Sequence, residues 1–472
     1  MSGLSPAWIY TAADDVSATP SVDLSGNAVY FPDWSGLINK VDSNLGTLIW
    51  SHPMTDYGLQ PGAISRTTPT LVGNMIILTA SAPLANPVET GAYVIAIDPS
   101  TGNLIWSVNV GSGMTSLMTG SPMVFNNVIY VGVSSSEERL TNPTFRGFVI
   151  ALSVSTGQTI WKTYMTPPGY TGAPIWSSTP AVDIARNQLY VTTGNNYLVP
   201  ESVQQCEQHA GANTKAAKAC QAPSNYEDSI VALNLSTGAI NWGTKCSVTD
   251  AWIGACPNGP ACPDPEGKDY DFGSGPNFMP ASVTGASTDL VGAGQKSGVF
   301  WALNPDNGDV VWKQFVGPGG LLGGIEWGTA ADNQRIYVAV ANSGHQPYSL
   351  YPTGMPWNGG AWSALDIATG AILWQTPDLG MNPMHPMIPA LALGPVTVAN
   401  GVLYGASTSG EMYAMDASTG NVLWSYLAPG SVNAAPAIIN GTVFWGTGYH
   451  HFPAKAPIGT ASNRFYSFTL NP

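Results

Sequence analysis

The sequence is poor in charged residues and has no basic run. Only 9% of its 472 residues are charged, and 15 Lys and Arg against 29 Asp and Glu give a net charge of −14. Nucleic-acid binding depends on Lys and Arg side chains that neutralise phosphates. Because the basic residues are few and scattered, nucleic acid is excluded as a partner.

The sequence also lacks a long apolar run and a signal peptide. No stretch approaches the ~18 consecutive apolar residues that a membrane-spanning helix needs, so no membrane span is expected. Met1 to Gly3 lead directly into the segment Leu4 to Trp8, with no apolar leader between them. We therefore expect a mature periplasmic or secreted form, with a cytosolic protein as the alternative.

The five cysteines include no adjacent pair, no CxxC zinc pattern and no CxxCH haem motif. All five lie between Cys206 and Cys262, and such clustering predicts two loop-stapling disulfides in an oxidising compartment plus one free thiol. Cys206–Cys220 is the favoured pair. The pairing of Cys246, Cys256 and Cys262 stays open.

What the sequence does contain is a repeat, in a chain with 53 Gly and 38 Pro. Each copy reads as a strand, a Thr-Gly-type turn, a second strand and a Trp. The turn glycine supplies the positive φ of a tight hairpin, and the Trp is large enough to pack one repeat against the next. The seven copies are Val41 to Trp50, Ala96 to Trp106, Ala151 to Trp161, Ala232 to Trp242, Ala302 to Trp312, Ala364 to Trp374 and Ala414 to Trp424.

This repeat predicts an all-β protein, an eight-bladed β-propeller. Four strands per unit of roughly 40–80 residues are typical of propeller blades. After Trp424 the chain supplies three more strands, and the segment Pro6 to Tyr10 carries the missing outer strand with its Trp. The N- and C-terminal strands therefore share one blade that closes the ring, and residues 1–472 form a single domain.

Unequal spacing between the repeats predicts three loop insertions, at about 197–226, 246–277 and 343–360. In a four-stranded blade, the connection into the innermost strand and the connection between the second and third strands open on the same face. The insertions are therefore expected at one end of the ring, and long loops gathered on a rigid scaffold indicate a functional site.

Polar residues converge on the same rim, since they occupy these two kinds of connection. Carboxylate and amide oxygens are hard ligands suited to Ca²⁺, and a Lys beside them could polarise a carbonyl or bind an anion. The simpler alternative is that they are solvated loop residues. They are Glu137, Glu138, Asn195, Asp269, Asp271 and Lys296.

Several loop motifs occur in an order that resembles the quinoprotein alcohol dehydrogenases, which use pyrroloquinoline quinone (PQQ). The chain is most similar to the polyvinyl-alcohol-dehydrogenase-like branch, and the resemblance covers essentially its whole length. The motifs are Ser65 to Pro69, Val133 to Glu138, Gly194-Asn195, Asp269 to Gly275, Lys296 to Gly298, Gly323 to Gly328 and Gly359 to Ser363.

The resemblance implies a role for each matched residue. Asp269 matches the base that takes the alcohol proton while hydride passes to the quinone, and Lys296 matches the cation at the quinone oxygens. Trp176 matches the indole stacked on the cofactor, and Arg66 and Thr119 match groups that hold its carboxylates. The cofactor site would also include Glu326, Trp327 and Trp362. The Ca²⁺ ligands, which could equally hold a lanthanide, would be Glu138 (favoured over Glu137), Asn195, Asp269 and Asp271.

The sequence thus predicts a PQQ- and Ca²⁺-dependent oxidoreductase acting on a small or polymeric alcohol. The chain has no haem motif, so the electrons are expected to pass to an external cytochrome or quinone. It also lacks the adjacent cysteines that often cover the cofactor in this family, which leaves open what covers it here. The alternatives are a cofactor-free propeller acting as a protein-binding scaffold and a family member with a changed reaction.

Overall fold

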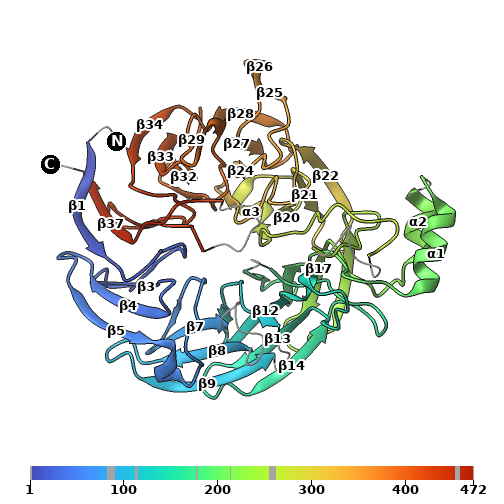
Figure 1. Ribbon diagram of the computed structural model, residues 1–472, viewed down its shortest axis with the longest axis horizontal. Helices are drawn as coiled ribbons and strands as arrows, with labels where there is room; N and C mark the ends of the chain where they lie inside the picture. The colour runs from blue at the N-terminus through green and yellow to red at the C-terminus, as the bar shows by residue number, and fades with distance from the viewer. Residues whose placement is uncertain are drawn as a thin grey trace.

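The computed structural model describes residues 3–81, 91–111, 115–176, 179–212, 214–254, 262–451 and 458–470. In this part of the chain, eight antiparallel sheets follow one another around a ring, in sequence order from blue to red (Figure 1). The predicted all-β, eight-bladed propeller is confirmed.

The first four blades are regular four-stranded sheets, and β10 (Ser116–Leu117) adds a short strand to β12 in blade 3. Blade 1 is β2 (Ser21–Val22), β3 (Ala28–Pro32), β4 (Leu37–Asp42) and β5 (Leu48–Pro53). Blade 2 is β6 (Thr70–Val72), β7 (Met75–Ser81), β8 (Ala92–Ile97) and β9 (Leu104–Gly111). Blade 3 is β11 (Met123–Phe125), β12 (Val128–Ser135), β13 (Phe148–Ser153) and β14 (Thr159–Tyr164). Blade 4 is β15 (Ala181–Asp183), β16 (Gln188–Thr192), β17 (Ser229–Asn234) and β18 (Ile240–Lys245).

The last four blades complete the ring. Blade 5 is β19 (Asn277–Met279), β20 (Leu290–Gly294), β21 (Val299–Leu303) and β22 (Val310–Phe315). Blade 6 is β23 (Ala330–Ala331), β24 (Arg335–Val340), β27 (Ala361–Asp366) and β28 (Ile372–Pro377). Blade 7 is β31 (Thr397–Ala399), β32 (Val402–Ala406), β33 (Glu411–Asp416) and β34 (Val422–Leu427). Blade 8 is β35 (Ala437–Ile439), β36 (Thr442–Gly446), β37 (Arg464–Leu470) and β1 (Leu4–Thr11).

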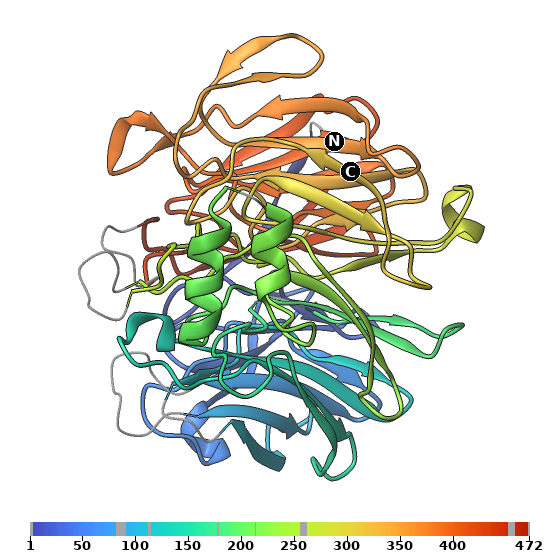
Figure 2. The same cartoon turned by 90° about the vertical axis from the view of Figure 1, so that its right-hand side faces the viewer.

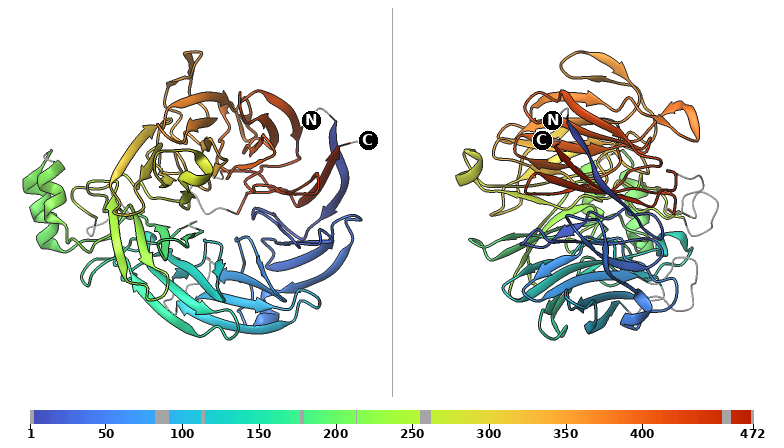
Figure 3. Two further views of the ribbon diagram at one scale, coloured as in Figure 1. Left: turned by 180° about the vertical axis from the view of Figure 1, so that it is seen from behind. Right: turned by 90° about the vertical axis from the view of Figure 1, so that its left-hand side faces the viewer.

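The ring is closed by pairing between the two ends of the chain. β1 runs antiparallel to β37, with Leu4 opposite Leu470 and Thr11 opposite Arg464. The two termini consequently lie side by side, as the rear view shows (Figure 3). This is the closure that the sequence predicted.

A Trp on each outer strand joins one blade to the next. Trp312 in blade 5, for example, donates its indole N–H to the carbonyl of Ile367 in blade 6 at 2.9 Å. A buried indole needs such a partner, because an unpaired N–H away from water destabilises the fold. The other seven bonds of this kind run from Trp8, Trp50, Trp106, Trp161, Trp242, Trp374 and Trp424.

The turn glycine of each repeat lies against the Trp of the preceding blade. Gly308 has φ +76°, and a Cβ atom on it would lie 2.5 Å from the ring of Trp242. Both the left-handed backbone and the close ring contact exclude a larger residue. The Thr-Gly and Trp elements of the repeat are therefore two halves of one contact between blades.

Apolar strand residues fill the space between neighbouring blades. Val131, Ile150 and Ile77 belong to one buried cluster that joins blades 2 and 3. β-Branched and aromatic side chains suit the pleated, buried faces of these sheets.

Several connections carry short elements of their own. α1 (Glu201–Ala210) and α2 (Thr214–Cys220) lie between β16 and β17 and stand outside the ring at the right of Figure 1. In Figure 2, which views the molecule from that side, they lie in front of the blades. Two small hairpins are formed by β25 (Tyr348–Leu350) with β26 (Met355–Trp357) and by β29 (Met381–Asn382) with β30 (His385–Pro389). The short helices are η1 (Met54–Tyr57), η2 (Glu137–Arg139) and α3 (Ala281–Thr284). None of the helices in the described ranges is long and apolar enough to cross a membrane.

The cysteines follow the expected pattern where they are described. Cys206 and Cys220 form a disulfide that staples α1 to α2, so the favoured pair is confirmed. Cys262 is also disulfide-bonded, and Cys246 is a free thiol. Cys256 lies outside the described residues.

Candidate active site

Lys296 lies at the centre of a buried group of acids, called the acid group below, which consists of Asp269, Asp271, Glu138 and Glu326. It occupies the turn between β20 and β21 and is 8% exposed. Its Nζ donates to Asp271 Oδ2 at 2.8 Å and to Asp269 Oδ2 at 3.1 Å. Burial alone would lower the pKa of Lys296, but the charges of Asp269, Asp271 and Glu326 outweigh it and raise the pKa well above its ordinary value. Lys296 is therefore a permanent cation that several carboxylates share.

Asp269 has one oxygen held and one oxygen open. Lys296 holds its Oδ2, while Oδ1 is buried without a hydrogen-bond partner among the described residues. Burial raises the pKa of Asp269 well above its ordinary value, and the charges of Asp271 and Glu138 add to the rise against the pull of Lys296. Such a carboxyl takes up a proton readily, or it requires a further cation.

The loop that carries Asp269 is held by Asp250, which the sequence reasoning missed. Asp250 Oδ1 accepts the backbone N–H groups of Lys268 at 2.6 Å and Asp269 at 2.9 Å, and Oδ2 accepts that of Tyr270 at 2.7 Å. These three bonds fix Asp269 at φ +58°, a left-handed conformation that Asp tolerates. Asp250 belongs to no repeat or loop motif, so no signal in a single sequence marks it.

Asn195 follows β16 and joins the same group. Its backbone N–H donates to Asp271 Oδ1 at 2.6 Å. Its side-chain Nδ2 donates to the carbonyls of Asn196 at 2.8 Å and Trp252 at 2.9 Å, and these bonds identify which side-chain atom is the amide oxygen. That oxygen, Oδ1, is buried and has no partner within the described part of the chain. It has the chemistry of an unused metal ligand.

The two neighbouring glutamates differ in what they can offer. Glu137 is engaged, since its Oε1 accepts from the hydroxyl of Thr115 at 2.8 Å and its Oε2 from the backbone N–H of Phe145 at 2.6 Å. For Glu138, burial raises the pKa to about 7, with Lys296 lowering it and Asp271 raising it. Glu138 therefore lies within electrostatic range of the acid group, whereas the carboxylate of Glu137 is committed to holding its own loop.

Glu326 approaches the group from the loop between blades 5 and 6. Burial raises its pKa to about 7, again with Lys296 as the opposing cation, and its Oε2 has no hydrogen-bond partner in the described ranges. Gly273 makes this approach possible, because a Cβ atom there would lie 2.5 Å from the carbonyl oxygen of Glu326. Glu326 adds negative charge beside the single Lys.

Trp176 is positioned by its neighbours on two sides. A Cβ atom on Gly194 would lie 3.0 Å from its indole nitrogen and 2.2 Å from Asp271 Oδ1, so the glycine admits both groups. The carbonyl of Trp176 accepts a bond from the hydroxyl of Thr119 at 2.5 Å. Its buried indole N–H has no partner among the residues described. The indole edge therefore lies next to the acid group.

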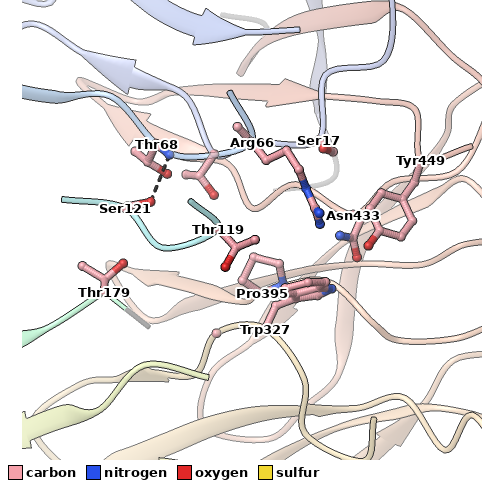
Figure 4. A pocket seen from close by; sticks show the side chains of 13 residues that line it. Ser17, Arg66, Thr68, Thr119, Ser121, Thr179, Trp327, Pro395, Asn433 and Tyr449 are labelled. Atoms are coloured by element: carbon pink, nitrogen blue, oxygen red, sulfur yellow. Dashed lines mark hydrogen bonds between the residues drawn. The ribbon is translucent and has the colours of Figure 1, made fainter. Parts of the chain in front are cut away.

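A cavity of about 170 Å³ has the predicted cofactor residues Arg66, Thr119 and Trp327 in its lining, but neither Lys296 nor the acids around it (Figure 4). Arg66 is the cation in its lining, and its guanidinium carbon lies 5.9 Å from the ring of Trp327. Thr119 faces the same space. Asn433 and Tyr449 also line it and were not predicted. Thr119 bonds to the backbone carbonyl of Trp176, so Trp176 connects the lining of the cavity to the acid group.

Trp362 is not brought to this cavity. It is fully buried in β27, where its ring lies 4.9 Å from that of Tyr413 within the apolar core between blades 6 and 7. A Cβ atom on Gly405 would lie 2.3 Å from the Trp362 indole nitrogen. Of the predicted residues, Asp269, Asp271 and Asn195 gather around Lys296, Arg66, Thr119 and Trp327 line the cavity, and Trp362 packs two blades together.

Fold and site define an eight-bladed propeller with a buried acid group around one Lys at one end of the ring. The profile of the family PQQ_2, described as outer membrane protein assembly factor BamB, matches residues 5–244 and 358–455. The match covers more than half of the chain, so the chain belongs to this family.

Individual relatives agree with this assignment. The chain is 29% identical to a polyvinylalcohol dehydrogenase of Sphingopyxis sp. (strain 113P3), over 90% of this chain and 65% of that protein, so it spans about two thirds of the relative's length. Two solved structures share its fold. One is a quinohemoprotein alcohol dehydrogenase from Comamonas testosteroni (TM-score 0.66, 18% identity, 99% of this chain and 76% of that one). The other is a europium-containing methanol dehydrogenase (TM-score 0.67, 16% identity, 99% and 93%). The predicted resemblance to the quinoprotein dehydrogenases is confirmed.

Proposed function

We propose that this protein is a PQQ-dependent alcohol dehydrogenase that holds Ca²⁺ beside the quinone and oxidises a small or polymeric alcohol. One observation carries the proposal: the carboxylates of Asp269 and Asp271 share Lys296, while buried oxygens of Asp269 and Asn195 have no partner among the residues that the structure describes. Buried polar groups are normally satisfied within the protein, so open ones at a charged site indicate a bound ligand. The dehydrogenase relative supports the same reaction class.

The acid group fits a hard cation. Asn195 Oδ1 and carboxylate oxygens of Asp269, Asp271 and Glu138 are the ligands that Ca²⁺ prefers, with Oδ1 of Asp269 left for the proton, and a lanthanide would suit the same set. One Lys against several buried acids leaves an excess of negative charge, which a bound cation would offset. Burial raises the pKa of Glu138 to about 7, and Asp271 adds to the rise while Lys296 and Arg139 lower it. A bound cation would favour its carboxylate form.

The neighbouring groups fit a flat, anionic quinone. Arg66 and Thr119 would hold carboxylates, for which a guanidinium is suited, and Trp176 would offer its ring to the plane of the cofactor. Lys296 would hydrogen-bond the quinone oxygens, with Glu326 and Trp327 at the edge of the site. When bound, the quinone would accept hydride, and the metal would polarise it.

Asp269 would act as the general base. Lys296 holds its Oδ2 and Asp250 holds its backbone, so Oδ1 is the atom left to take the alcohol proton. The raised pKa of Asp269 makes it a stronger base than an ordinary carboxylate. Lys296 would stabilise negative charge that develops on the oxygen facing it. The electrons would then pass to an external cytochrome or quinone.

The disulfide between Cys206 and Cys220 supports work outside the cytoplasm, in the periplasm or after secretion. The second candidate function is a cofactor-free scaffold, which the description of the matching family favours. Against it stands the cost of burying several acids around one Lys, which a scaffold does not need.

The deciding experiment combines binding with turnover. Purified protein is supplied with PQQ and Ca²⁺, quinone binding is followed by tryptophan fluorescence and calorimetry, and dye reduction is measured with primary, secondary and polymeric alcohols. We expect stoichiometric binding and activity with at least one alcohol. If neither is found, the dehydrogenase is ruled out and the scaffold stands. Binding without dye reduction would instead indicate a changed reaction.

A further inference from the structure

A second cluster of ionisable residues lies where the ring closes. Asp14 and Asp15 follow β1, and His450 and His451 follow β36. The connection from β36 to β37 in blade 8 is equivalent to the one from β20 to β21 that carries Lys296. His450 also follows Tyr449, which lines the cavity (Figure 4). The cluster therefore lies on the site end of the ring and uses none of the residues assigned to the proposed reaction.

The four side chains are close enough to hold one metal ion. One potential ligand atom of each lies within 4.8 Å of those of the other three. His450 Nδ1 lies 2.8 Å from Asp15 Oδ2, and His451 Nε2 lies 2.8 Å from Asp14 Oδ2. Each imidazole is thus oriented by a carboxylate through one nitrogen, and its other nitrogen makes no hydrogen bond to the residues described here. Histidines in metal sites are oriented in this way.

The surrounding protein holds parts of the cluster in place. Asp15 is 1% exposed, and its two oxygens accept the backbone N–H groups of Ser462 at 3.0 Å and His450 at 2.7 Å. The ring of His451 stacks on Trp34 at 5.2 Å with an angle of 14° between the planes. Ligands held by their surroundings lose little freedom on binding.

The two His–Asp pairs are not separate from each other. The imidazole centroids of His450 and His451 are only 3.7 Å apart, so both rings lie at one place. One ion could therefore reach both imidazoles and an aspartate. His52 and Asp56, at 2.9 Å, show what an isolated His–Asp pair looks like in the same protein.

We propose that His450 and His451, with at least one of Asp14 and Asp15, bind one divalent transition-metal ion of the Zn²⁺ or Cu²⁺ class. Mixed imidazole and carboxylate ligands suit these ions, whereas Ca²⁺ takes oxygen ligands. The residues come from opposite ends of the chain and meet only when β1 pairs with β37. The ion would therefore link the two ends of the chain at the seam, the place where β1 and β37 close the ring. Its binding energy would add to the stability of the closed propeller.

The test uses the full chain without a histidine tag, stripped of metal and kept in excess Ca²⁺ so that hard-oxygen sites are filled. ZnCl₂ is titrated by calorimetry, and thermal melting is recorded with and without Zn²⁺. We expect one equivalent of Zn²⁺ per chain and a rise in Tm, neither of which requires PQQ. Failure of the proposed dehydrogenase would leave this result unchanged.

Two variants and one matched control locate the site. His451→Gln and Asp14→Asn alter partly exposed side chains, and each should weaken Zn²⁺ affinity by ~10-fold or more and reduce the rise in Tm. His52→Gln breaks the isolated pair and should bind Zn²⁺ as the unchanged protein does. Melting without metal confirms that each variant folds. The absence of saturable Zn²⁺ binding, or equal binding by His451→Gln, Asp14→Asn and the unchanged protein, would overturn the proposal.

Discussion

The outer strands of the ring and the group around Lys296 differ in whether their polar atoms have hydrogen-bond partners. In the outer strands, each repeat Trp donates its N–H to a carbonyl of the next blade, as Trp312 does to Ile367. Around Lys296, the side-chain oxygens Asn195 Oδ1, Asp269 Oδ1 and Glu326 Oε2 are buried without partners in the described part of the chain. The contacts between outer strands satisfy their hydrogen bonds. Single open atoms occur elsewhere in the described ranges, as at Trp362 Nε1 and Asp378 Oδ2, but around Lys296 three of them share one charged group. Such a concentration of open atoms is expected at a binding site.

Removing the base should separate the two regions most clearly. Asp269→Asn keeps the shape of the side chain but not its ability to take a proton, so turnover with PQQ and Ca²⁺ should fall by ~10²–10⁴-fold. The thermal stability should stay nearly unchanged, because one buried charge is lost and Lys296 keeps Asp271. Dye reduction and melting measure the two effects. A large loss of stability would instead assign Asp269 to the scaffold.

Asp250 tests whether the site depends on how its loop is held. The carboxylate of Asp250 now accepts hydrogen bonds from three backbone N–H groups. In Asp250→Asn, the amide N–H group would face at least one of these donors, so that hydrogen bond would be lost. We expect kcat to fall by ~10-fold or more while KM changes little, because misplaced catalytic groups lose rate first. Asp183→Asn is the control, since Asp183 is a buried acid that pairs with Arg186 in blade 4, outside the loop of Asp269. Equal kcat values in the two variants would contradict a positioning role.

A pair of glycines tests the scaffold alone. Gly308 and Gly401 have nearly equal φ values, +76° and +77°, but a Cβ on Gly308 would meet Trp242 at 2.5 Å while nothing lies within 4 Å of one on Gly401. Gly401→Ala should cost about 1–2 kcal/mol of left-handed strain, and Gly308→Ala should cost about 1–3 kcal/mol more. Denaturant unfolding measures both. Equal losses would mean that the contact between blades contributes little.

Asp378 provides the smallest effect and a pH dependence outside the site. Burial raises its pKa to about 7, against hydrogen bonds from Ser407 and Gly380. The folded protein therefore keeps a proton that the unfolded chain releases, so stability should fall as the pH rises from about 4 to about 7. Asp378→Asn should remove this loss. The Tm of the variant minus the Tm of the parent should therefore be larger at pH 8 than at pH 5. A constant difference in Tm between variant and parent across that range would argue against the shift.

Much of the fold could be read from the sequence because its signals are local and repeated. The Thr-Gly turn and the Trp lie within one repeat, and counting the copies predicts the blades. The site was harder to predict. Asp250 acts through backbone N–H groups of a loop 18 to 20 residues away, and Asn433 and Tyr449 reach the cavity from blades 7 and 8. Trp362 shows the opposite case, since its motif placed it at the cofactor but its side chain packs into a core.

The sequence by itself determined the strands, the turns, the contacts between blades and the membership of a family, since each depends on neighbours in the chain or on a periodic pattern. Only the tertiary structure decided which acids share Lys296, which oxygens are left open, and that Asp14 meets His451 across the seam. These pairings join residues that are far apart in sequence, and they exist only after the ring has closed.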